Sequence, residues 1–490
     1  MERASRSVRL GAAALGMAAA GLLAAGCHGS DGGNLFIITG GSGTAPTNSG
    51  TTPTPGSFSL VTTDPAGGTI LESSDGSTRK IAGTFQQSVT MEAKYKWILD
   101  APVFIGLEDG SAQATLTVQA GTTVLGRGGT PPSMLVIKRG AKIVADGTAQ
   151  QPIVFTSAQP VGSRATGDWG GLIINGRAPV NDIGPGGELP LGEGASGKYG
   201  GNDPHDSSGT LRYVRVEFAG HVFTSDDELN GIAFQGVGDG TTVDFVQVHR
   251  NADDGVEFFG GTVNVKHVLI TGCLDDSLDW TSGWTGKAQF VVLHQWAGGA
   301  DNAIEADNLE ASHGATPRSH PQISNMTIVG PTDNAALGKA GLRLRRGTAF
   351  NVWNSIVTEV NDFGLDLDDT STWNLAYTDA PGSYTTLSGQ CTVQNTFFFA
   401  NQLGDFADDA GDPQLDSVFS TQQTPGNQSG QDPLLTSLSQ SSPDLRPQAG
   451  SPVLTSFTNP GDPFFQLVGF SGAMDATSDW TSGWATFAAN

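Results

Sequence analysis

The sequence predicts an all-β solenoid, in which short strands of successive coils stack in parallel. Apolar residues alternate with polar ones on either side of a glycine bend in "LTVQAGTTVLG" from Leu116 and again in "LVIKRGAKIVADG" from Leu135. A tetrad of a small, an aliphatic, a variable and an apolar residue recurs six times between residues 231 and 367, at steps of 24, 22, 26, 38 and 23 residues. A repeat of roughly 22 residues with two or three short strands is the size of one solenoid coil, and coils stack about 4.8 Å apart.

Residues 1–26 have the pattern of a secretory signal. Arg3, Arg6 and Arg9 precede an apolar run that ends in "LLAAGC" at Cys27. A basic start, a short apolar run and small residues before the cut are typical of a cleaved signal peptide. The run resembles a bacterial lipobox, although Ala24 stands three residues before the cysteine. The resemblance implies that Cys27 becomes a lipidated first residue; a secreted protein with a cysteine at this place is the alternative.

Residues 27–57 follow as a tether, because "GGSGTAPTNSGTTPTPG" lacks apolar residues and is rich in Gly, Ser, Thr and Pro. A lipid, a tether and then a domain is the layout of a protein displayed at the cell surface. His28 after the cysteine resembles signals that direct lipoproteins to the outer membrane. We therefore expect a secreted protein that is lipid-anchored to the cell envelope and that touches membrane only through this lipid.

The flanks of the repeat are expected to close the solenoid. A parallel solenoid has two open ends, which would pair with other chains unless they were covered. Residues 58–100 are assigned to an N-terminal cap, and residues 101–370 to the coils. Residues 371–490 lose the repeat period and are assigned to C-terminal coils and a capping region.

Several longer segments resemble one protein family. They are "GDWGGLIINGRAPVN" from Gly167, "YGGNDPHDSSGTLRYVRVEFAG" from Tyr199, "DDGVEFFGGTVNVKHV" from Asp253 and "SNMTIVGP" from Ser324. The chain is similar in these segments to bacterial surface proteins with a right-handed parallel β-helix of the pectate-lyase-like kind. The resemblance implies that fold with capped ends. It implies little about activity, because the fold hosts lyases, hydrolases, binders and adhesins.

Acidic residues recur in the turns and tetrads of adjacent coils. Asp254 should lie near Asp276, with Asp301 close to the same column, and the outward tetrad position is acidic in three coils running. Carboxylates about 5 Å apart repel one another unless something compensates, and calcium, which takes six to eight oxygen ligands, is the natural compensator. The predicted calcium ligands are Asp253, Asp254, Asp275, Asp276, Asp301, Glu257, Asp279 and Glu305.

Two other interpretations of these acidic residues stay open. Aspartates in turns often only accept hydrogen bonds from their own backbone on a solvated acidic face. Alternatively, "NADDG", "DDSLDW" and "RLR" together resemble the polygalacturonase-type pattern of Asn-Thr-Asp, Asp-Asp and Arg-x-Lys on successive coils. That resemblance implies a polysaccharide hydrolase, whose catalytic candidates would be Asp254, Asp275, Asp276, Arg343 and Arg345. The extra residue in "NADDG", the absence of a Gly-His-Gly coil and arginine in place of the lysine depart from the pattern.

A lyase would need calcium beside a basic residue that can lose its proton. Arg343 and Arg345 are near the column, but arginine is almost never deprotonated. The sequence therefore favours a role without catalysis, with a hydrolase or lyase as the alternative.

Composition and charge limit the partners. The formal net charge of −24 argues against nucleic acid and against anionic lipid surfaces, both of which need clustered Lys and Arg. The expected role is to bind or present a glycan, a matrix component or a receptor protein at the cell surface, and an envelope spacer is a third possibility. Trp280, Trp284 and Trp296 are candidates for stacking on sugar rings. Cys273 and Cys391 could form a disulfide or remain thiols.

Overall fold

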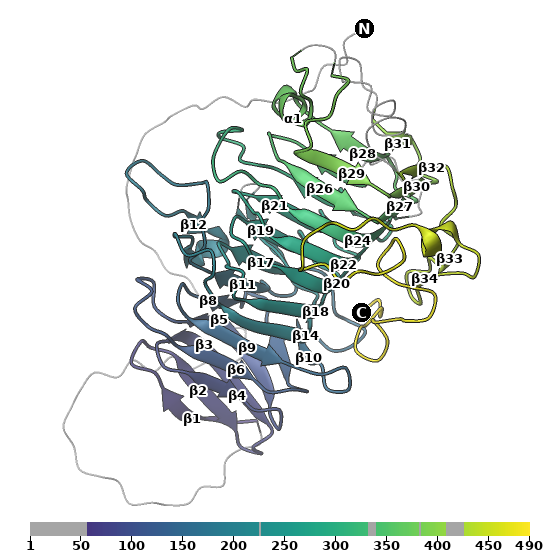
Figure 1. Cartoon of the computed structure of the whole chain (residues 1–490). Helices are drawn as coiled ribbons and strands as arrows, with labels where there is room; N and C mark the ends of the chain where they lie inside the picture. Colours follow the sequence, from purple (N-terminus) through teal and green to yellow (C-terminus); the bar gives the residue numbers. More distant parts are fainter. Residues whose placement is uncertain (1–55, 225–226, 332–339, 382–383, 408–425) are drawn as a thin grey trace, which may run out of the picture. The chain divides into compact units, whose positions relative to one another are not determined.

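The computed structural model describes residues 56–224, 227–331, 340–381, 384–407 and 426–490, all of which belong to one compact unit, Pro53–Asn490. The proposed signal peptide, Cys27 and nearly all of the tether lie outside the described residues. Figure 1 shows successive strands stacked side by side along one axis. In the described part of the chain, 28 strands form one continuous sheet that is wound into coils, which confirms the all-β parallel solenoid.

The coils begin after a short antiparallel segment. β1 (Phe58–Thr63) pairs antiparallel with β2 (Thr69–Ser73), and β2 pairs antiparallel with β3 (Thr78–Phe85). β3 then pairs in parallel with β5 (Lys96–Ile105). Parallel pairing thus starts within residues 58–100, where the sequence predicted only a cap.

Each coil contributes strands to three parallel ladders, and long strands span the first two. The first ladder contains β4 (Val89–Met91), β6 (Thr115–Val118), β9 (Lys142–Asp146), the first halves of β14 (Gly209–Glu217), β18 (Thr242–His249), β20 (Val265–Thr271), β22 (Lys287–His294) and β24 (Gln322–Val329), then β26 (Phe350–Trp353) and β29 (Cys391–Gln394). The second contains part of β5, β7 (Thr123–Gly126), β10 (Ile153–Ser157), the second halves of the same long strands, β27 (Ile356–Thr358), β30 (Phe397–Phe399) and β32 (Gln428–Ser429).

The third ladder carries the tetrads. It contains part of β5, β8 (Leu135–Ile137), β11 (Leu172–Asn175), β17 (Ile232–Gln235), β19 (Val256–Phe259), β21 (Leu278–Thr281), β23 (Ile304–Ala306), β25 (Leu342–Leu344), β28 (Phe363–Leu367) and β31 (Gly404–Phe406). A single α-helix, α1 (Thr370–Ala376), follows β28 in the described residues. No described helix has the length and apolar character needed to cross a membrane.

Alternation along the third ladder places aliphatic residues inside and charged residues outside. Val256, Leu278 and Ile304 are in register and are buried in the core, as expected. The next residue of each tetrad points outward, and these residues form one column in register: Glu257, Asp279, Glu305, Arg343 and Asp366. The predicted charged column is therefore present.

Where the first and second ladders meet, several residues take left-handed backbone conformations and stack along the axis. The rings of Tyr213 and Phe245 lie 4.4 Å apart, those of Phe245 and His267 4.1 Å, and those of His267 and Phe290 4.9 Å. All four have positive φ angles between 46° and 60°. Stacking of residues from successive coils stabilises this bend, because the rings bury apolar surface against one another.

The C-terminal segment lies along the side of the coils. The Gln247 side chain accepts a hydrogen bond from the backbone N–H of Thr486 and donates one to its carbonyl, at 2.9 and 2.6 Å. Gln289 binds the backbone of Gln466 in the same way, at 2.8 Å for both bonds. Figure 1 shows this segment, in yellow, beside β20, β22 and β24. It covers outward apolar residues such as Leu269.

This segment includes β33 (Leu435–Ser437), β34 (Asp444–Pro447) and the short helix η2 (Pro452–Thr455). The coils themselves continue to β32. Residues 371–490 therefore contain the last coils and then a segment that covers the side of the coils. Cys273 and Cys391 are buried free thiols.

Candidate functional site

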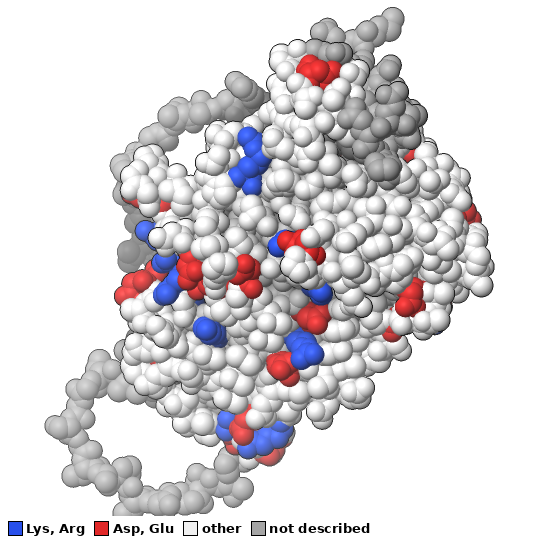
Figure 2. All heavy atoms as spheres, in the orientation of Figure 1, with Lys and Arg blue, Asp and Glu red and all other residues white. Residues whose placement is uncertain are grey.

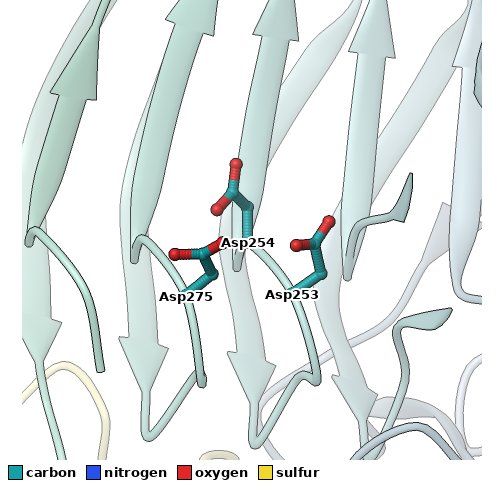
Figure 3. Close-up of side chains that lie close together, drawn as sticks. All are labelled: Asp253, Asp254 and Asp275. Carbon is teal, nitrogen blue, oxygen red and sulfur yellow. The ribbon is translucent and has the colours of Figure 1, made fainter. Parts of the chain in front are cut away.

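The acidic residues gather where the chain enters the third ladder. Asp253 and Asp254 lie in the turn before β19, and Asp275 lies at the equivalent place before β21. Figure 3 shows their carboxylates side by side on adjacent coils. The parallel stacking of the coils brings the two turns together, since residues 22 positions apart in sequence occupy neighbouring rungs.

The eight predicted ligands form a continuous group. In each of four overlapping trios, one carboxylate oxygen from every member lies within 4.8 Å of the others. The trios are Asp253–Asp254–Asp275, Asp254–Glu257–Asp279, Asp275–Asp276–Asp301 and Asp276–Asp279–Glu305. We call these eight residues the acidic columns. The structure thus brings together every residue that the sequence proposed as a calcium ligand.

The register of one member differs from the expectation. Asp301 donates its backbone N–H to the carbonyl of Asp275 at 3.2 Å, which places it beside Asp275. Asn302 is the residue that lies opposite Asp276, because Ser277 donates its N–H to the Asn302 carbonyl at 3.2 Å. The doublet of the third coil is therefore Asp-Asn, and the columns lose one carboxylate there.

Some of the carboxylates bind the backbone of the next coil and others have unused oxygens. Asp254 Oδ1 accepts a hydrogen bond at 3.0 Å from the backbone N–H of Asp276, which lies one coil further on and not in the turn of Asp254 itself. In contrast, the buried Oδ1 atoms of Asp276 and Asp279 have no hydrogen-bond partner. A buried polar atom without a partner costs about 1–3 kcal/mol, so these oxygens favour a ligand.

The surroundings favour protonation of these carboxyl groups when no cation is bound. Burial, reinforced by the nearby Glu228 and Asp275, raises the pKa of Asp253 to about 8. Burial raises the pKa of Asp254 and Asp276 well above the usual range, and carboxyl groups nearby raise both further by repulsion. Glu257 and Asp279 have pKa values raised for the same reasons. The columns can therefore be neutralised by protons or by a cation.

Arginines neutralise the far end of the columns. Arg345 forms ion pairs with Glu305 and with Asp307, its Nε lying 2.8 Å from Asp307 Oδ1. Arg343 pairs with Asp368 at 2.9 Å and lies 3.9 Å from Asp366. The pKa of Arg345 is raised by its acidic partners despite the opposing effect of burial. Both arginines therefore remain charged, and neither is suited to act as the base of a lyase.

The structure adds acidic and amide residues that sequence reasoning missed. Glu193 comes from the short helix η1 (Glu193–Ala195), between the strands β12 (Leu191–Gly192) and β13 (Gly197–Lys198). Asn230 Nδ2 donates to Glu193 at 3.0 Å and to Glu257 at 2.7 Å, and so links this insertion to the columns. Asn230 precedes a tetrad just as Asp254 does, so aligning the tetrads would have found it. Glu193 lies outside the repeat and gave no such signal.

The three tryptophans do not provide a surface for sugar rings. Trp280 and Trp284 are completely buried, and the Trp284 ring stacks on Phe258 at 3.9 Å in the core. Trp296 is 8% exposed and lies under Arg250, whose guanidinium carbon is 5.4 Å from its ring centre. The sequence expectation of glycan stacking at Trp280, Trp284 and Trp296 is therefore wrong, because packing takes up all three rings.

The charged residues are sparse on the face drawn in Figure 2. That face is mostly uncharged, and its Asp, Glu, Lys and Arg residues occur in small groups of both signs. The acidic character of the site comes from the four carboxylate trios of the columns. An oxygen-only ligand set with several carboxylates fits a hard cation such as Ca²⁺, and a soft metal would prefer sulfur or imidazole ligands.

Successive coils whose strands stack in parallel ladders define a β-helix protein. A family model described as a pectate-lyase like beta helix domain matches residues 83–437. The chain therefore belongs to the pectate-lyase-like β-helix family, whose fold fits a carbohydrate-related role. Comparisons with curated proteins and with solved structures found no match.

Proposed function

We propose that this protein binds an extended glycan at the cell surface and that calcium, held by the acidic columns, stabilises its β-helix. The observation that carries the calcium part is the set of four carboxylate trios with unpartnered buried oxygens at Asp276 and Asp279. Ca²⁺ would be held by the carboxylates, and its charge would replace the protons that otherwise neutralise them.

The family supports the glycan part of the proposal. The long parallel sheets of a β-helix offer a surface on which an extended chain can lie. A receptor protein or matrix component is the other partner that a surface-displayed solenoid would suit. A glycan array probed with the purified full-length protein tests this directly: saturable binding to glycans is expected, and failure to bind any of them would contradict the proposal.

A polysaccharide hydrolase is the second candidate, because one observation favours it. A carboxyl group whose pKa is raised, such as that of Asp253, keeps the proton that a general acid must donate. Against this, Asp254 and Asp276 are only 7% and 5% exposed, and a catalytic carboxyl must reach the glycosidic oxygen. Mass spectrometry of soluble products distinguishes the two functions. Oligosaccharides released by the wild type and absent with Asp276→Asn would establish the hydrolase instead of the binder.

The lipid anchor is proposed from Cys27 and the preceding "LLAAG". We expect Cys27→Ser to move the protein from the membrane fraction to the soluble or secreted fraction, because the cysteine thiol carries the lipid. Immunoblotting of the fractions measures this, with Ser30→Ala in the tether as the control. If Cys27→Ser stays in the membrane fraction, the protein is held at the envelope by another means.

A further inference from the structure

A cavity lies beside the acidic columns, at the N-terminal end of the third ladder. The insertion that carries η1 and the hairpin of β15 (His221–Thr224) and β16 (Asp227–Leu229) form one wall, and β5 and the approach to β8 form the other. We call it the side cavity. It has a volume of about 500 Å³ and is lined by Pro102, Phe104, Pro131, Met134, Gly194, Ala195, Phe223 and Asp227. Small-ligand sites have this size and this mainly apolar lining.

A second, acidic compartment of about 490 Å³ adjoins the side cavity. The two share Ala195 and Asp227, and the second is also lined by Glu108 and Glu193. Glu193 and Glu257 both accept hydrogen bonds from Asn230, so the acidic compartment reaches the edge of the columns. One continuous site thus joins two phenylalanine rings to three carboxyl groups.

The wall that carries the aromatic ring is held in place by specific contacts. Asp227 Oδ1 accepts the backbone N–H of Gly194 at 2.7 Å, which ties the hairpin to the insertion. His221 packs edge-on against Phe223 at 4.6 Å, yet Phe223 remains 37% exposed. An exposed aromatic ring beside carboxylates is a combination that suits a sugar, whose C–H face packs on the ring while its hydroxyls donate to the carboxylates.

We infer that the side cavity binds sugar residues without negative charge, so that it selects neutral glycans over glycans of uronic acids. This inference rests on the proposed function and names its ligand class. Asp227 would repel a carboxylated sugar, since like charges brought together at a binding site are a means of rejecting a ligand. Glu108 and Lys138 lie 2.6 Å apart and offset each other's charge, and burial raises the pKa of Glu193, so the repulsion is assigned to Asp227.

Isothermal titration of the full-length protein at fixed calcium, with neutral, amino-sugar and uronic-acid oligosaccharides of equal length, tests the inference. We expect the neutral oligosaccharide to bind at least about tenfold more tightly than the uronic acid, which corresponds to a difference of about 1.4 kcal/mol. Phe223→Ala should weaken neutral binding about tenfold through loss of ring contact. Val222→Ala, on the same hairpin and 52% exposed but outside the cavity lining, should leave it unchanged.

Asp227→Asn provides a second variant that keeps the acceptor for Gly194 and removes the charge. It should retain neutral binding and reduce the preference over uronic acids. Uronic acids binding as tightly as neutral sugars, or neutral binding that survives Phe223→Ala, would overturn the inference but leave glycan binding standing. Binding of the amino sugar at least as tightly as the neutral one supports it, since the acidic wall does not repel a cation. No binding of any oligosaccharide would contradict the proposed function as well.

Discussion

Arg345→Met should lower the free energy of unfolding by about 3 kcal/mol, because it leaves the partly buried Glu305 without its ion-pair partner and Asp307 with Arg346 alone. Arg345 pairs with Glu305 and Asp307, which are 17% and 9% exposed, and it also attracts the buried Asp279. Chemical denaturation at neutral pH measures the loss. The loss should shrink at about pH 4, where protonation neutralises the carboxyl groups that the arginine otherwise balances.

Arg343→Met is the matched control, because Arg343 lies on β25, two residues before Arg345, which directly follows that strand. Arg343 and its partner Asp368 are 37% and 42% exposed, and an exposed ion pair contributes only about 0–1 kcal/mol. An equal effect of the two substitutions would show that burial of the acidic columns does not set the stability. If Arg345→Met changes the free energy of unfolding only slightly, the carboxyl groups that Arg345 contacts are neutral in the wild type.

Removing calcium should lower the melting temperature by about 5 °C at neutral pH, if calcium is present at about 100 times its dissociation constant. Binding of calcium to the folded state alone then adds about 2.7 kcal/mol to the free energy of unfolding. The melting temperature of a large domain changes by about 2 °C for each kcal/mol. Differential scanning calorimetry with and without a chelator measures the shift. Magnesium at the same concentration is the control, because it requires a smaller octahedral site and gives up its water less readily.

The same experiment has a pH dependence with a definite sign. The pKa of Asp253 in the folded, calcium-free protein is raised to about 8, above the value of about 4 in an unfolded chain. The folded form therefore keeps a proton that the unfolded form releases, and stability present at low pH is lost as pH rises toward about 8. Calcium should oppose this loss, so the gap between the two melting curves should widen from about pH 5 to pH 8. A constant gap would place any bound calcium away from these carboxyl groups.

The repeat allowed the coils and the acidic columns to be predicted, but only in the part of the chain that carries the tetrads. Because inward and outward positions alternate along a strand, the sequence alone places Val256 and Glu257 on opposite sides of it. The same alternation places the last residue of each tetrad inside, and it therefore also predicts that Trp280 is buried. The sugar-stacking hypothesis required Trp280 to be exposed and so conflicted with this alternation. Trp284 follows the strand and had no periodic signal.

Features outside the period depend on contacts between distant parts of the chain. Glu193 reaches the columns from an insertion, and Thr486 binds Gln247 across 239 residues. Neither contact repeats along the sequence, so no pattern marked it. The unpartnered state of Asp276 Oδ1 likewise results from how three coils pack, which composition and spacing do not encode.

Isothermal titration calorimetry with CaCl₂ tests the central claim, that the acidic columns bind calcium. The wild type should bind Ca²⁺ saturably, and Asp276→Asn should bind at least about tenfold more weakly, because it removes a charged ligand shared by two trios. Asp146→Asn, an exposed carboxylate on β9, should bind as the wild type does. Absence of saturable binding by the wild type, or unchanged binding by Asp276→Asn, would contradict the claim and leave protons to neutralise the columns.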